Sequence, residues 1–205
     1  MSIVKLNNRG VRSVTAFGSL TSGSMTFIKK LTASSSSTLS FVDGSSSVVL
    51  DNTYKEYLFT FKDIHTASDT QRFTFQTSTD SGSSYGVTVT STAFGTYHFE
   101  DGSDQQLSYD TNDDLAQSTN FQPLTNTIGN GNDECGSGTL HIFDPSSTTF
   151  VKHFIAVANT YYSGDYSFND FTAGYGNTTS AVNAVQFKMS SGNIDSGTIK
   201  MYGVT

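Results

Sequence analysis

The sequence is poor in the residues that form covalent cross-links or bind structural metals. Its 205 residues include one cysteine, Cys135, so no disulfide can form within the chain. One cysteine without a C-x-x-C pattern also excludes the common cysteine-based zinc sites. We therefore interpret Cys135 as an incidental thiol.

Long hydrophobic runs are missing as well. No apolar run approaches the roughly 20 residues that span a bilayer. The first residues, Met1 to Lys5, lack the apolar centre of a signal peptide. We expect synthesis in the cytoplasm and no membrane partner.

Basic residues are few and unevenly placed. Residues 1–30 hold five of the 11 basic side chains and no acidic one, whereas the remaining 175 residues hold all 18 acidic side chains and six basic ones. The body therefore has a formal charge of −12, which repels phosphate backbones and excludes nucleic acid as a main partner. We predict that residues 1–24 form an extended basic arm that docks on an acidic partner. The alternative is that this arm supplies the first strands of the body.

Serine, threonine and glycine dominate the composition, but the chain does not have the composition of a disordered protein. It contains 31 Ser, 29 Thr and 18 Gly, together with 16 Phe and 10 Tyr spread along its length. Disordered chains are poor in aromatic residues. Aromatic residues among Thr, Ser and Val favour pleated strands with one buried and one polar face.

Apolar and polar residues alternate with a period of two, and turn residues separate the runs. This pattern predicts an all-β fold: an antiparallel β-sandwich or jelly roll of about ten strands over residues 25–205. Expected strands include Val48–Leu50, Lys55–Lys62, Tyr85–Thr92, Phe94–Phe99 and Val151–Asn159. The last of these is apolar on both faces in its second half, which predicts a central strand.

One stretch departs from this pattern, at residues 100–134. It contains eight acidic side chains and no Lys or Arg. We predict an irregular surface excursion of low local stability, with a helical turn near Asn112–Gln117.

No catalytic motif is present. The four histidines, His65, His98, His141 and His153, stand in no recognisable motif, and there is no G-x-S-x-G sequence. Phosphate-binding glycine loops are absent too, and Gly174-Tyr175-Gly176 is interpreted as a turn. These absences predict a protein that is not an enzyme.

Acidic side chains offer two weaker alternatives. The groups Asp110, Asp113 and Asp114, and Asp133 and Glu134, could supply the carboxyl pair of a glycosidase, although the chain lacks tryptophan to line a sugar cleft. The same groups could bind calcium, although neither follows the EF-hand spacing. We favour a solvated acidic loop, and we assign no catalytic, metal or cofactor residue.

Five segments resemble virion structural proteins of tailed phages, particularly those of marine picocyanobacteria. The most distinctive is the S-G-x-I-x-S-G-x-I-x-x-Y-G run within Ser191–Val204. In those proteins this run forms the last hairpin of a jelly-roll-like domain. The other matching segments are Lys5–Val11, Tyr54–Phe59, Phe75–Tyr85 and Phe143–Thr148.

The resemblance implies a non-enzymatic structural protein of the virion, in a tail appendage or on the capsid surface. Its expected partners are other virion proteins, bound through the arm. The alternative function is a receptor- or glycan-binding adhesin at a fibre tip, using Tyr161, Tyr162, Tyr166 and Tyr175. We also expect a homo-oligomer, with a trimer favoured, because several apolar residues lie outside the best-patterned strands. These residues are Val4, Leu6, Phe17, Phe27 and Ile28.

Overall fold

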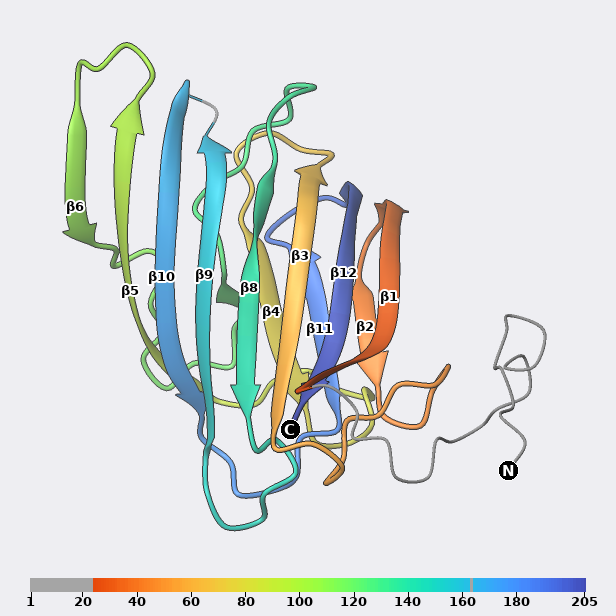
Figure 1. Ribbon diagram of the computed structural model, residues 1–205. Coiled ribbons are helices and arrows are strands. Elements are labelled where there is room, and N and C mark those ends of the chain that lie inside the picture. The colour runs from red at the N-terminus through yellow and green to blue at the C-terminus, as the bar shows by residue number, and fades with distance from the viewer. Residues whose placement is uncertain (1–23, 163) are drawn as a thin grey trace, which may run out of the picture.

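The computed structural model describes residues 24–162 and 164–205, and within them the chain is all-β (Figure 1). Twelve antiparallel strands form two sheets, so the predicted sandwich is confirmed with two strands more than expected. The larger sheet has the order β1 (Met25–Ser36), β12 (Ile194–Val204), β3 (Glu56–Thr66), β8 (Gly136–Phe143), β9 (Lys152–Tyr162), β10 (Tyr166–Gly176), β5 (Val89–Phe99) and β6 (Gln105–Tyr109). The smaller sheet has the order β2 (Leu39–Val42), β11 (Ala184–Met189), β4 (Phe73–Ser78) and β7 (Gln122–Pro123).

Eight of the strands form a jelly roll. β1 pairs with β12, β2 with β11, β3 with β8 and β4 with β7, so each pair encloses the next along the chain. Such nested pairing arises when one long antiparallel hairpin folds over into two four-stranded sheets. The other four strands are two inserted hairpins, β5–β6 and β9–β10, which extend the larger sheet beyond β8.

The core lies between the smaller sheet and the inner face of the larger sheet, and it includes Phe154 and Ala156 of β9 as well as residues of the jelly-roll strands. On β3, Tyr57, Phe59 and Phe61 are buried, as the alternation of Lys55–Lys62 predicts. The ring of Phe187, on β11, lies 5.5 Å from Phe59 and 5.6 Å from Phe73, centroid to centroid. The first contact joins the two sheets and the second lies within the smaller sheet, and both keep water from the inner faces and stabilise the sandwich.

Two strand predictions are wrong. Val48 and Leu50 are buried, but the segment forms no strand, because the Val48 O accepts the Gly44 N–H at 3.0 Å and the Leu50 N–H donates to Asp43 Oδ1 at 2.8 Å. Residues 85–99 contain one strand instead of two, because Ser91 and Thr92 stay within β5. Ser91 is buried, and its hydroxyl donates to Gln122 Oε1 at 2.6 Å.

The acidic stretch 100–134 is only partly the surface excursion that the sequence predicts. It contains β6 and β7, and residues 122–129 are all buried. The expected helical turn near Asn112–Gln117 is a non-helical turn. Part of this stretch covers the inner side of the extension. The backbone N–H of Ser91 donates to Leu115 O at 2.8 Å, and that of Asn126 donates to Asp170 Oδ2 at 2.9 Å.

The predicted basic arm, residues 1–24, lies outside the described residues except for Ser24. The arm includes Val4, Leu6 and Phe17, which we expected to be uncovered. Among the described residues there is no helix long and apolar enough to cross a membrane.

Candidate assembly face

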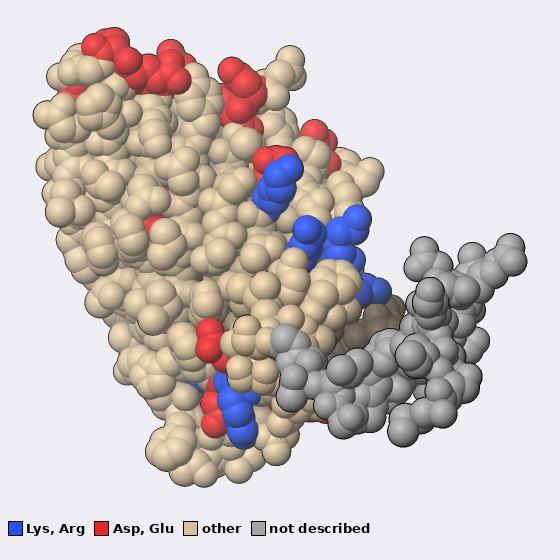
Figure 2. All heavy atoms as spheres, viewed as in Figure 1, with Lys and Arg blue, Asp and Glu red and all other residues tan. Residues whose placement is uncertain are grey.

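The larger sheet turns one face toward the core and the other outward, toward the viewer in Figures 1 and 2. Side chains alternate between these faces along each strand, as in β9, where buried and exposed residues alternate from Lys152 to Thr160. On β6, β5, β10, β9 and β8 the outward side chains include no Asp, Glu, Lys or Arg. In a body of charge −12, this uncharged surface is exceptional.

Strand register places eight outward residues in one continuous row across the sheet. Each member is the direct cross-strand partner of the next. The row changes from aromatic at the β6 edge, through valine and threonine, to lysine at the β1 edge. In order, its members are Tyr109, Phe94, Phe171, Val157, Thr139, Thr60, Lys200 and Lys30.

The aromatic end of this row belongs to a larger exposed apolar surface, which we call the apolar half. It consists of Leu107, Tyr109, Phe94, Phe171, Val157 and Ile155. Phe94 is 46% exposed and Ile155 50% exposed. The rings of Phe94 and Phe171 stack with centroids 5.0 Å apart and planes 6° apart. Flat, contiguous apolar surfaces of this kind mark contacts with other macromolecules.

The predicted central position of Val151–Asn159 is confirmed, but one of its two apolar faces is exposed. Val157 and Ile155 make the second half of Val151–Asn159 apolar on both faces, which predicted a central strand. β9 is central, but only its inner side chains are buried, while Ile155 and Val157 face outward and are exposed. Phe27, expected to be uncovered, is 55% exposed, whereas Ile28 packs partly against the core.

The lysine end of the row forms a second surface, the lysine patch. Lys30, Lys62 and Lys200 line a hollow of about 430 Å³ together with Thr60 and Thr198. These side chains come from the three neighbouring strands β1, β12 and β3. In Figure 2, Lys and Arg side chains gather on this side of the face, and acidic side chains cluster along its upper end.

The acidic residues that the sequence singled out are held in separate contacts. Asp113 is buried and pairs with Arg72. Asp110 Oδ2 accepts a hydrogen bond from Asn126 Nδ2 at 3.1 Å, and Asp114 Oδ2 accepts one from Tyr109 Oη at 2.6 Å.

The second acidic group lies elsewhere, beside His65. Glu134 accepts the backbone N–H of Gly131, and Asp133 is exposed. The described part of the chain contains no group of three or more His, Cys, Asp or Glu side chains that could hold a metal ion. Cys135 is half-buried, and burial raises the pKa of its thiol, which lowers its reactivity at neutral pH.

Two buried carboxyl groups have strongly shifted acidity. Burial raises the pKa of Asp170 to about 8, opposed by the hydrogen bond from the Asn126 N–H. Burial also raises the pKa of Asp113 to about 6, although the charge of Arg72 opposes the shift. Asp170 points inward from β10, and Asp113 belongs to the stretch that covers this inner side, so both lie away from the outward face.

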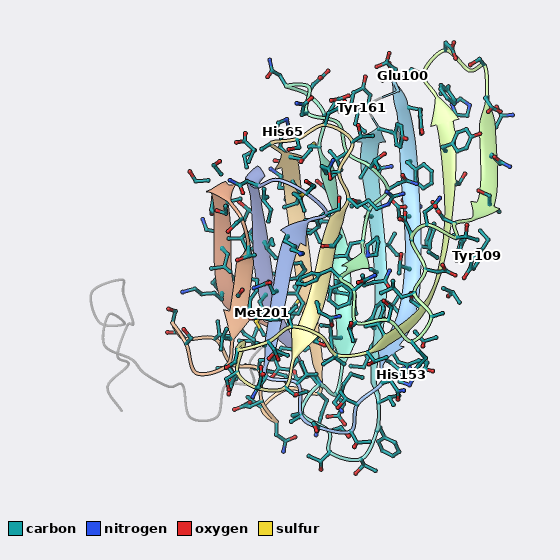
Figure 3. All side chains as sticks on the ribbon, turned by 180° about the vertical axis from the view of Figure 1, so that it is seen from behind. His65, Glu100, Tyr109, His153, Tyr161 and Met201 are labelled. Carbon is teal, nitrogen blue, oxygen red and sulfur yellow. The ribbon has the colours of Figure 1, made fainter. Side chains whose placement is uncertain are left out.

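Histidines are not brought together. His65 and His153 lie at opposite ends of the sheet, as Figure 3 shows. His141 Nδ1 lies 2.6 Å from Glu56 Oε1, His65 Nε2 lies 3.0 Å from Gly131 O, and His98 is exposed.

The four tyrosines of the adhesin hypothesis are only partly brought together. The rings of Tyr162 and Tyr166 stack with centroids 4.3 Å apart. Tyr166 also lies 5.4 Å from Tyr97. Tyr161 is on the opposite face of β9, and Tyr175 lies at the other end of β10, 6.0 Å from His153.

Comparison with known proteins adds no relative: no family model, no curated protein and no solved structure matches the chain.

Proposed function

We propose that this chain is a non-enzymatic structural protein of a tailed-phage virion, assembled as a homo-oligomer through the apolar half of its larger sheet. The observation that carries the proposal is the uncharged aromatic surface of the exposed Phe94 and Tyr109 and the partly exposed Phe171. Burying such a surface against another protein removes apolar area from water and stabilises the complex.

Charge supports self-association at this surface. Copies with a body charge of −12 repel each other over most directions of approach. The side chains of the apolar half are uncharged, so two copies can meet there with less repulsion, although the Asp114 carboxylate binds the hydroxyl of Tyr109 at one edge. A rigid jelly roll is also a scaffold of viral capsid proteins and of lectins, and the C-terminal motif resembles that of phage virion proteins. A trimer is the form we expect, with residues 1–24 docking on other virion proteins.

Replacing Phe94 by Asp tests the proposal, because it places a charge at the centre of the apolar half. We expect native mass spectrometry to show an oligomer for the unaltered protein. For Phe94→Asp we expect mostly monomer, with the dissociation constant raised at least about tenfold.

The matched control is Phe150→Asp. Phe150 is 69% exposed in the loop between β8 and β9, outside the larger sheet. This variant should assemble normally, and both variants should melt close to the unaltered protein. A monomeric unaltered protein, or equal behaviour of the two variants, would refute assembly through the apolar half.

One observation favours the adhesin as a second candidate. Five aromatic rings cluster at the free end of the extension, on its inner side: Tyr97, Phe99, Tyr162, Tyr166 and Phe168. Asp104 Oδ2 accepts the Tyr97 hydroxyl at 2.8 Å, which adds a carboxylate for sugar hydroxyls. If this cluster binds a glycan, a glycan array should detect it and Tyr162→Ala should abolish the signal. An unchanged signal, or none with the unaltered protein, counts against the adhesin.

A further inference from the structure

The lysine patch concentrates positive charge at a cost to the fold. Lys30 and Lys200 are direct cross-strand partners, and like charges in directly opposed positions destabilise a sheet. Lys62, on the next strand, pairs with its chain neighbour Asp63, at 2.8 Å. Three of the 11 basic residues of an acidic protein thus line one hollow, with no acidic partner from another of the described strands.

An acidic surface of matching character lies at the opposite side of the same sheet. Glu100, Asp101 and Asp104 occupy the β5–β6 turn, and Asp165 occupies the adjoining β9–β10 turn. The two turns are joined by the hydrogen bond from the Glu100 N–H to Asp165 O at 3.1 Å. All four carboxylates are exposed, and none forms an ion pair with another described residue. We call these residues the acidic tips.

We propose that the acidic tips of one copy dock into the lysine patch of the next copy. The inference rests on the proposed function, since it names the partner of the assembly. Figure 2 shows the two surfaces on opposite sides of the outward face, with the uncharged strands between them. A contact between different surfaces of identical chains is heterologous, and such contacts close into rings when the rotation permits.

Charge complementarity favours the acidic tips of a second copy as the partner of the lysine patch. Neutralising the patch with carboxylates removes the repulsion between Lys30 and Lys200 and the repulsion among the tips themselves. Single exposed ion pairs contribute little, but several opposed charges together set the orientation and raise the rate of association. The tips and the apolar half share the β5–β6 hairpin: Glu100, Asp101 and Asp104 lie at its turn, and Phe94 and Tyr109 pair at its opposite end.

The experiment uses charge reversal in the full chain. One variant carries Lys30→Glu, Lys62→Glu and Lys200→Glu, and a second carries Glu100→Lys, Asp101→Lys, Asp104→Lys and Asp165→Lys. Each alone should raise the dissociation constant at least about tenfold in sedimentation experiments at low salt. Mixing the two variants should restore mixed oligomers, because each then offers the surface that the other lacks. Lys55→Glu, at an exposed lysine just before β3, is the control and should assemble normally.

The outcomes separate this inference from the proposed function. If Phe94→Asp disrupts assembly but the reversed variants assemble normally, the docking is wrong and the apolar half stands. If both reversed variants fail and mixing restores nothing, the docking is also wrong. Retention of the unaltered protein on a heparin column, lost with the reversed lysines while assembly persists, would assign the patch to a free polyanion instead.

Discussion

Asp113 and Asp170 lie on the inner side of the extended sheet, where each carboxyl group has lost most of its contact with water. Arg72 pairs with Asp113, but Asp170 accepts its hydrogen bond from a neutral backbone N–H. A carboxyl group whose pKa is raised by folding binds its proton more tightly in the folded than in the unfolded chain. The stability it contributes is therefore present at low pH and is lost as the pH rises.

Replacing Asp170 by Asn should flatten the dependence of stability on pH. In the unaltered protein, Asp170 lowers the free energy of unfolding by up to about 1.4 kcal/mol per pH unit between its ordinary pKa and about 8. Asp113 adds a similar slope only up to about pH 6. In the Asp170→Asn variant, the side-chain amide oxygen would still accept the Asn126 N–H. Urea unfolding at several pH values between 5 and 8.5 measures the difference.

The variant should gain stability relative to the unaltered protein as the pH rises from 6 to 8. Asp144→Asn, at an exposed residue that pairs with Lys55, is the control and should leave the slope unchanged. Parallel curves for Asp170→Asn and the unaltered protein would show that Asp170 is ionised throughout this range.

Residues of the core could be predicted from the sequence, but those of the assembly face could not. Alternation along Lys55–Lys62 identifies Tyr57, Phe59 and Phe61 as one face, and burial of that face follows from its aromatic character. Alternation does not say whether a second apolar face is covered. Ile155 and Val157 therefore predicted the central position of β9 correctly, but their own side chains lie on its exposed face.

Among the elements, the two inserted hairpins create the difference between this molecule and an eight-stranded jelly roll. They carry Phe94, Phe171, Val157 and Leu107, and also the acidic tips. The sequence pattern predicted most of the strands because inward positions are apolar at every second residue. It failed at residues 122–129, whose burial depends on long-range hydrogen bonds that hold this segment against the rest of the fold. One of these is the hydrogen bond from the Gln71 N–H to Ile128 O, at 3.0 Å.

Hydrogen exchange should divide the acidic stretch 100–134 into two parts. β6 is an edge strand in which every residue is exposed, so its amide protons should exchange fast. Residues 122–129 are buried beneath the sheet and should exchange slowly, at rates near those of β3 and β9. After exchange at neutral pH and quenching in acid, mass spectrometry of peptic peptides resolves the two regions. Equal, fast exchange across 100–134 would restore the sequence prediction of a uniformly unstable excursion.

At the scale of the whole molecule, charge and apolar surface are arranged along one direction of a single sheet. The row from Tyr109 to Lys30 crosses all eight strands, with aromatic side chains at the β6 end and lysine side chains at the β1 end. No local sequence pattern contains this arrangement, because residues that are neighbours in the row are far apart in the chain. Lys200 and Thr60, for example, become adjacent only through the pairing of β12 with β3. Predicting the face therefore requires the topology first.

Nested pairing also has a consequence for how the molecule is made. β1 is an edge strand whose single hydrogen-bonded neighbour among the described strands is β12, so the first described strand to leave the ribosome waits for the last. The inserted hairpins close on themselves early, since their partners are adjacent in sequence. Until residues 194–204 are synthesised, β1 and β3 each present an unpaired backbone edge. We therefore expect nascent chains of this protein to be prone to aggregation until the last strand has paired.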